Sequence, residues 1–313
     1  MSGKFGIDRL GGLRGIDRLG GLRGIDHSGG LLGIDRSGGL HGIDHSGGLR
    51  VIACEGAPRD LGVDQGTACA EAIRARVERS GGVGVWLGRF RPFEAGALER
   101  ARRTARDVRR HFPHLDERVI GIARGAKVPE IALAHMLARE LGPDGEVAAL
   151  RAGIDARGRI VVQVPPVGIL RQARPDHGFA SVEWTLPWLP GALAGANRAG
   201  LAGAVVSPGS EGELGCAAPA FLLLQNCLAQ FETAANAAEW CERRPAGGRA
   251  QLLFADAAGG RAAVSIEGEK RTRLEPAAAA FAAQGAGAVR LVLDPAARSL
   301  EGESGEERLR LEP

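Results

Sequence analysis

The sequence predicts an α+β protein with a helical first half and a β-rich second half. Helical patterns dominate up to the turn Gly142-Pro143-Asp144-Gly145, and strand-like runs follow it. The strands are grouped and do not alternate one by one with helices, which favours a layered α+β domain over βαβ units. With 313 residues, of which 44% are hydrophobic and only 4% aromatic, the chain can bury a sizeable core built mainly from aliphatic side chains.

The helical half opens with a short apolar strand at residues 51–54, followed by the turn Gly56-Ala57-Pro58. Four helical segments follow, at residues 59–79, 94–111, 115–124 and 129–140. Pro113 ends the second segment, because proline cannot continue a helix. Pro129 opens the last one at its first position, where no backbone N–H is needed.

The second half reads as strands with two helices between them. Residues 146–154 and 159–164 are strand-like and joined by the hairpin sequence Asp155-Ala156-Arg157-Gly158. Further strands are predicted at residues 192–196, 201–206, 251–255, 261–266 and 289–293, and helices at 219–229 and 233–243. The segment from residue 301 is charged, and we expect it to be a loose tail.

The first fifty residues are a separate problem. From Gly6 to Arg50 a nine-residue unit, G-G-L-x-G-I-D-x-[LS], repeats five times without a slip in register. The period matches that of calcium-binding nonapeptides, but the Asp and the third Gly each fall one place late. The two interpretations are a calcium-binding coil and a flexible, low-complexity leader, and we predict the disordered leader. The predicted organisation is a leader at 1–50, one domain at 51–300 and a charged tail at 301–313.

Charge and cysteine content name no partner and no cofactor. The 40 basic and 37 acidic residues are interspersed, which favours neither nucleic acid nor a membrane as a partner. No apolar run reaches the roughly 20 residues of a membrane helix, and no classical export signal is present. The five cysteines form no CxxC pair, so we expect reduced thiols, a cytoplasmic location and no metal site. The oligomeric state stays open.

Several stretches carry glycine, proline and aspartate in a recognisable order. They are residues 56–62 with Gly66, residues 111–117 with 121–126, residues 195–201, residues 256–259, and Asp294-Pro295. Together they resemble the acyl-coenzyme A:6-aminopenicillanic acid acyltransferase family, which is the C45 peptidase class of N-terminal-nucleophile (Ntn) hydrolases. The resemblance covers about residues 50–300 and leaves the leader outside.

This resemblance implies a four-layer αββα sandwich that cuts its own chain before a cysteine. The new N-terminal Cys then acts as nucleophile, with its own α-amine as base, and cleaves or transfers acyl groups at amides. Hydrogen-bond donors aimed at the tetrahedral oxyanion complete the site.

The sequence departs from the family pattern where this chemistry should lie. The nucleophile is expected near Ala148, Ala149 or Leu150, and no cysteine occurs between Cys69 and Cys216. An arginine expected in the helix after residue 219 is replaced by Gln225-Asn226. Asn197 is the one polar residue that can be assigned an oxyanion role, and the alternative is that it satisfies a turn.

Three hypotheses about function follow. In the first, the domain is a degenerate family member that stays uncut and inactive. In the second, it is an active amide hydrolase or acyltransferase with Cys216 as a relocated nucleophile, since Cys216 precedes an apparent helix start. The competing explanation for Cys216 is a small core residue. In the third, it is a binding module that holds a small acyl or amide ligand or another protein.

Overall fold

The computed structural model describes residues 50–80, 95–141, 146–206, 218–276, 289–304 and 307–313. It also describes two short antiparallel strands, β1 (Gly24–Ile25) and β2 (Leu31–Leu32), within the repeats. The rest of the leader, and with it the prediction of disorder or calcium binding, lies outside these ranges. Together the described residues form an α+β protein, as predicted.

The helical half agrees closely with the prediction. Its elements are β3 (Val51–Gly56), α1 (Pro58–Ala68), α2 (Ala70–Arg79), α4 (Ala95–His111), α5 (Pro113–Ala126) and α6 (Glu130–Arg139). The helix predicted at 59–79 is divided at Cys69, whose backbone leaves the helical region at φ −106°, ψ 15°. Pro58 and Pro113 each stand at the start of a helix, where their fixed φ is already helical.

The second half contains more strands than the sequence predicted. It comprises η2 (Glu146–Ala149), β4 (Arg151–Ile154), β5 (Ile160–Val164), β6 (Ile169–Pro175), β7 (Ser181–Thr185), β8 (Ala194–Asn197), β9 (Leu201–Val206), α7 (Leu222–Gln230), α8 (Ala234–Arg243), β10 (Arg249–Asp256), β11 (Arg261–Glu267), β12 (Lys270–Leu274), β13 (Val289–Asp294), β14 (Ser299–Ser304) and β15 (Glu307–Leu311). Strands β6, β7 and β12 were not expected. Residues 146–149, expected in a strand, form a short 3₁₀ helix.

The expectation of a loose tail from residue 301 is wrong. Residues 301–304 complete β14, and β15 pairs with β14 in antiparallel register. Leu300 and Leu311 face each other in that register, and both are buried. Their burial supplies the hydrophobic free energy that a charged, unanchored tail would lack.

Apart from the β1–β2 pair, the described strands form two sheets that pack face to face. The larger has eight strands in the order β12-β11-β10-β9-β8-β7-β6-β3, and the smaller has five in the order β15-β14-β13-β5-β4. Neighbouring strands are antiparallel except for β3 and β6, which run parallel. Strands β4, β5 and β13 lie against β8 and β9. The buried side chains of these strands are almost entirely aliphatic.

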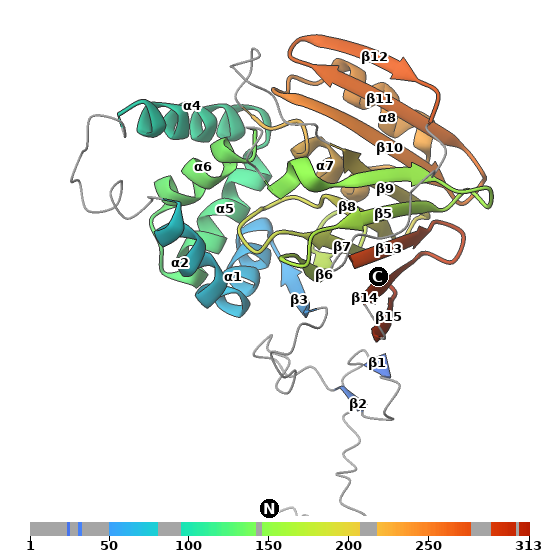
Figure 1. Ribbon diagram of the computed structural model, residues 1–313, viewed down its shortest axis with the longest axis horizontal. Coiled ribbons are helices and arrows are strands. Elements are labelled where there is room, and N and C mark those ends of the chain that lie inside the picture. Colours follow the sequence, from blue (N-terminus) through green and yellow to red (C-terminus); the bar gives the residue numbers. More distant parts are fainter. Residues whose placement is uncertain are drawn as a thin grey trace, which may run out of the picture.

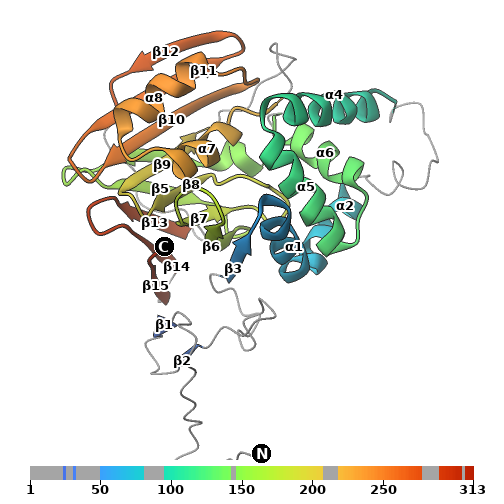
Figure 2. The same cartoon turned by 180° about the vertical axis from the view of Figure 1, so that it is seen from behind.

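The helices cover the other face of the eight-stranded sheet. Helices α7 and α8 lie over its centre and one end, and α1 contacts β3 and β6 at the other end with α5 packed behind it (Figures 1 and 2). No helix in the described ranges packs extensively on the outer face of the five-stranded sheet. Those ranges therefore show three layers, in the order helices, large sheet, small sheet.

Helices α1 and α5 touch backbone to backbone through glycines. A Cβ atom added at Gly66 would lie 2.3 Å from the carbonyl oxygen of Ile122, and one at Gly121 would lie 2.1 Å from that of Arg59. Such distances are too short for any side chain, so only glycine allows this approach. The same glycines belong to the stretches that resemble the C45 family, which gives those stretches a packing role.

No helix in the described ranges has the length and apolarity required to cross a membrane.

We expect Gly66→Ala to lower the free energy of unfolding by about 3 kcal/mol, because its methyl group must push α1 away from α5. Urea denaturation followed by circular dichroism measures the change. Gly96→Ala is the matched control, since Gly96 is an exposed glycine in α4 where an added Cβ would meet only the end of the Arg100 side chain, at 3.5 Å. This control should be neutral or stabilising by up to about 1 kcal/mol. Equal losses in both variants would contradict the packing role.

Candidate functional site

Three of the turns at one end of the two sheets are held by an aspartate. Asp155, Asp256 and Asp294 all accept hydrogen bonds from backbone N–H groups of their own turns. Asp256 uses both of its carboxylate oxygens. Its Oδ1 accepts a hydrogen bond from the backbone N–H of Gly260 at 2.7 Å, and its Oδ2 accepts one from the backbone N–H of Ala234, at the start of α8, at 2.9 Å. Aspartate is favoured in such turns because its short side chain reaches the backbone two to four residues ahead.

The turn between β8 and β9 joins this group of hairpins. The backbone N–H of Ala257 donates to the carbonyl oxygen of Gly200 at 2.9 Å. Gly200 has φ +94°, and an added Cβ there would lie 2.8 Å from the Cβ of Ala257. Both the backbone angle and the lack of space thus require glycine. The structure therefore brings together three of the family-like stretches, namely residues 195–201, 256–259 and Asp294-Pro295.

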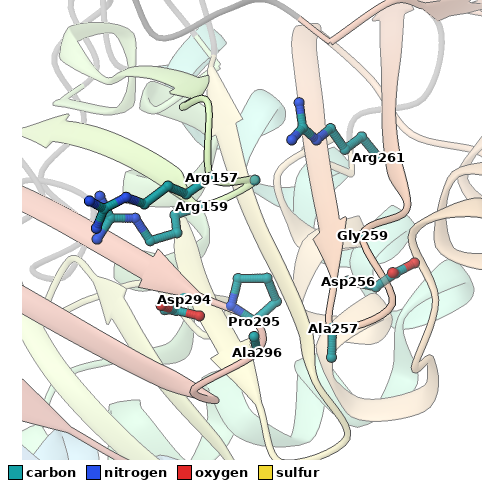
Figure 3. Close-up of a pocket in the computed structure, with 10 residues that line it drawn as sticks. Arg157, Arg159, Asp256, Ala257, Gly259, Arg261, Asp294, Pro295 and Ala296 are labelled. Atoms are coloured by element: carbon teal, nitrogen blue, oxygen red, sulfur yellow. The ribbon is translucent and has the colours of Figure 1, made fainter.

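A cavity of about 220 Å³ lies between these turns (Figure 3). Three arginines line it, from two different hairpins. Arg159 is paired with Asp155, with 2.8 Å between Nη2 and Oδ2. The guanidinium groups of Arg157 and Arg261 have no hydrogen-bond or ion-pair partner among the described residues, and both residues are exposed.

The lining of this cavity consists of arginine, aspartate, glycine, alanine and proline residues. None of its lining residues carries a hydroxyl or thiol. The carboxylate of Asp256 already accepts three backbone hydrogen bonds, which leaves it poorly placed to act as a base. The hairpin cavity is therefore a polar surface pocket with excess arginine.

Asn197 lies at the same end of the sheets and is fully buried. Its Nδ2 donates to the carbonyl oxygens of Leu228 and Phe231, both at 2.8 Å, and its Oδ1 accepts from the backbone N–H of Leu201 at 2.8 Å. Both amide protons are used, so none is left for an oxyanion. The arrangement supports the alternative role of Asn197, in which it ties the β8–β9 turn to the end of α7.

The segment expected to hold the nucleophile lies at the opposite end of β4. Ala148 and Ala149 are in η2, and Leu150 follows as a buried core residue. The backbone N–H of Val147 donates to Oε2 of Glu140 at 3.1 Å, and burial raises the pKa of Glu140. Because β4 has four residues, it places this segment about 13 Å from the hairpin cavity. Asn197 and residues 148–150 are thus not brought together.

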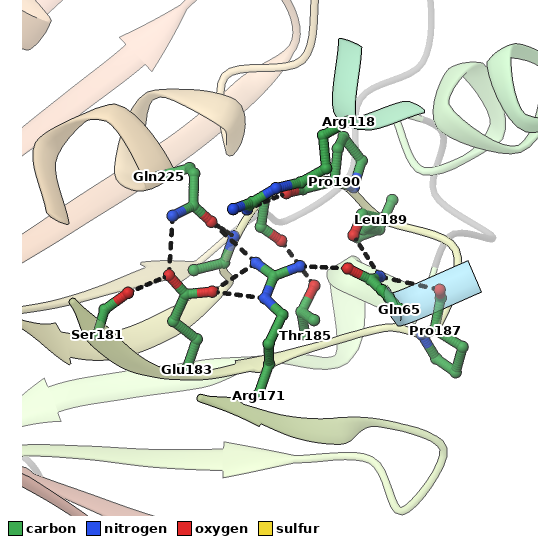
Figure 4. A network of polar contacts seen from close by, with 12 residues as sticks. Gln65, Arg118, Arg171, Ser181, Glu183, Thr185, Pro187, Leu189, Pro190 and Gln225 are labelled. Carbon is green, nitrogen blue, oxygen red and sulfur yellow. Dashed lines mark hydrogen bonds and ion pairs between the residues drawn. The ribbon is translucent and has the colours of Figure 1, made fainter. Parts of the chain in front are cut away.

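A buried ion pair lies on the helical face of the large sheet. Arg171 on β6 and Glu183 on β7 are opposite in register, and both are inaccessible to solvent. The Arg171 Nε donates to Oε2 of Glu183 at 2.7 Å. Gln225 on α7 bridges the pair, because its Oε1 accepts from Arg171 at 2.9 Å and its Nε2 donates to Glu183 at 2.8 Å (Figure 4).

Two further helices join the network around this pair. Gln65 on α1 accepts from Arg171 and donates at 2.9 Å to the carbonyl oxygens of Pro187 and Leu189. Arg118 on α5 donates to the Pro190 carbonyl oxygen at 2.8 Å, and burial, together with the charge of Arg171, lowers its pKa to about 10.

The same charges decide the ionisation of Glu183. Burial by itself would raise the pKa of this carboxyl, but the charges of Arg171 and Arg118, together with the hydrogen bonds from Ser181 and Gln225, outweigh burial and lower it. The carboxylate of Glu183 thus stays ionised although it is inaccessible to solvent, because Arg171 and Arg118 lie beside it. Sequence reasoning missed this network, since Arg171 and Glu183 lie on strands it did not predict. The one available signal was Gln225, at the place where the resemblance expects an arginine.

The described cysteines are unsuited to act as nucleophiles. Cys54, Cys69, Cys227 and Cys241 are all fully buried. Burial raises the pKa of Cys54 to about 12 and that of Cys69 to about 11, and burial and the neighbouring Cys241 raise that of Cys227. The reactive form is the thiolate, which these shifts disfavour. Cys216 lies outside the described residues.

No group of three or more His, Cys, Asp or Glu side chains in the described ranges is arranged to hold a metal ion.

Comparisons with known proteins find similar solved structures but no similar family or curated sequence. No family model matches the chain, and no curated protein matches it. Among solved structures, penicillin V acylase from Agrobacterium tumefaciens is similar, with a TM-score of 0.29 and 18% sequence identity. The match covers 41% of this chain and 49% of the acylase chain, so it spans about half of that protein. A likeness at this level does not establish a shared fold.

We expect Arg171→Met to lower the free energy of unfolding by about 3 to 5 kcal/mol, because it leaves Glu183 charged in the core without its partner. Arg59→Met is the matched control, since the Arg59–Glu117 pair is about half exposed, and it should cost less than about 1 kcal/mol. Urea denaturation measures both. A loss for Arg171→Met no larger than that of the control would show that the network contributes little.

The burial of four thiols predicts which cysteines react in the native state. Treated with iodoacetamide at pH 8, the folded protein should gain at most one label, on Cys216, while the urea-unfolded protein gains five. Mass spectrometry of the intact chain and of its tryptic peptides provides the measurement. Rapid native labelling of Cys54 or Cys69 would contradict the buried positions.

Proposed function

We propose that this protein resembles the C45 class of Ntn hydrolases in fold but has lost the self-cleaving step and works as an uncut, non-catalytic protein. The observation that carries the proposal is the chemistry of residues 148–150. Self-cleavage begins when a hydroxyl or thiol adds to the preceding carbonyl carbon and the acyl group moves from nitrogen to that atom. The side chains of Ala148, Ala149 and Leu150 have no such atom, and Leu150 is sealed in the core.

The layer order supports the fold part of the proposal. An αββα sandwich contains a helical layer, two facing sheets and a second helical layer, and the first three have counterparts here. The family-like stretches also occupy structural positions, at the α1–α5 contact and at the hairpin turns. Scaffold residues can persist in this way when reactive ones are lost, because packing and catalysis depend on different side chains.

The second candidate function is an amide hydrolase or acyltransferase that uses Cys216. The argument for this function is that the other four cysteines are buried, which leaves Cys216 as the remaining candidate nucleophile. Amide hydrolysis that disappears in Cys216→Ala and persists in Cys69→Ala would support this function. An activity unchanged in both variants would exclude it.

The intact mass of the purified protein tests the main proposal without any substrate. We expect a single chain of about 32.6 kDa that stays whole during storage. A sample purified under denaturing conditions directly from cells is the control for proteolysis during purification. Two fragments that meet between residues 145 and 155, found in both samples, would show that self-cleavage does occur and overturn the proposal.

A further inference from the structure

A second cavity, of about 270 Å³, lies in the helical half, between α4, α5 and α6. Its walls are mostly aliphatic and include Val108, Val119, Ile131 and Leu137. Cavities between packed helices with apolar walls and a few polar groups are common sites for small ligands. This helical cavity is separate from the hairpin cavity and from residues 148–150.

One wall of the helical cavity is held rigidly. Helix α5 is locked against α1 by the glycine contacts at Gly62, Gly66, Gly121 and Gly125, which leave no room for sliding. Val119 and Ile120 project from the opposite side of α5 into the cavity lining. This wall of the cavity is therefore preformed, and a ligand need not pay for ordering it.

The charged groups at the cavity are predominantly acidic. Asp116 and Glu130 line it together with Arg109, and the Nε of Arg109 donates to Oδ2 of Asp116 at 2.8 Å. The hydrogen bond and charge of Asp116 raise the pKa of Arg109, to which Glu130 and Glu117 add. Glu117 is held by Arg59. Glu130 is left with no hydrogen-bond or ion-pair partner among the described residues.

We propose that the helical cavity binds a small organic cation that carries a short hydrocarbon chain. The ammonium group is held by Glu130, and the chain lies among Val108, Val119 and Ile131. An anionic ligand is disfavoured, because its head group would have to displace Asp116 from Arg109 and lie beside Glu130.

The volume sets the size of the ligand. A water molecule occupies about 30 Å³ in the liquid, so the cavity has space for a chain of about six carbon atoms and its head group. Burial of such a chain supplies the affinity, and the carboxylate of Glu130 selects the sign of the charge. A primary alkylammonium of this length satisfies both requirements.

Three probes with the same chain and different head groups test the proposal on the full-length protein. They are n-hexylammonium, hexanamide and hexanoate. We expect n-hexylammonium to raise the melting temperature and to bind in calorimetry with a dissociation constant on the order of 1 mM. Hexanamide should bind about tenfold more weakly and hexanoate not measurably. Equal or tighter binding of hexanoate or hexanamide would overturn the assignment of a cation.

Variants locate the binding. Glu130→Gln should weaken n-hexylammonium binding about tenfold, whereas Glu71→Gln, an exposed glutamate in the first turn of α2, should leave it unchanged. Ala105→Leu, a half-buried position in the cavity lining, should fill the cavity and remove binding. Unchanged affinity in both Glu130→Gln and a folded Ala105→Leu would place the ligand elsewhere. These results do not depend on whether the chain cuts itself.

Discussion

The structure depends on a charged pair in a dry interior. Arg171 and Glu183 lie on adjacent strands, and three helices reach them through Gln65, Arg118 and Gln225. Burying ions is costly, so such a pair is tolerated only where every remaining lone pair and proton is satisfied. The hydrogen bonds of Gln65 and Gln225 to Arg171 thus restrict how α1 and α7 lie on the sheet, because hydrogen bonds are directional and apolar contacts are not.

The neutral side chain of Gln225 is central to this balance. A basic residue at position 225 of α7 would add a third positive charge to a region that already holds Arg171 and Arg118 against Glu183. The amide instead donates to Glu183 and accepts from Arg171 with one side chain. Gln225 thus bridges the ion pair without adding a charge to the core.

Local signals explain which parts of the fold could be predicted. The helices were found because Pro113 and Pro129 mark helix boundaries in the sequence and apolar residues recur at helical spacing. Strands β6 and β7 were not predicted because each is buried along most of its length and includes a buried charged residue. Neither therefore shows the alternation of apolar and polar residues by which a strand is identified. Asn197 was identified from the turn sequence of residues 195–201. Only the structure shows that both of its amide protons are donated to backbone carbonyl oxygens at the end of α7. The helical cavity depends on three helices meeting, which no local pattern reveals.

The parallel pairing of β3 with β6 has a consequence for folding kinetics. Val51 pairs with Leu170, so the first strand of the domain has no partner until more than a hundred further residues have been synthesised. Contacts so distant in sequence form slowly, because a large loop must close first. The α1–α5 contact, such as that of Gly66 with Ile122, closes a loop of about half that length, so its closure costs slightly less entropy than the β3–β6 pairing.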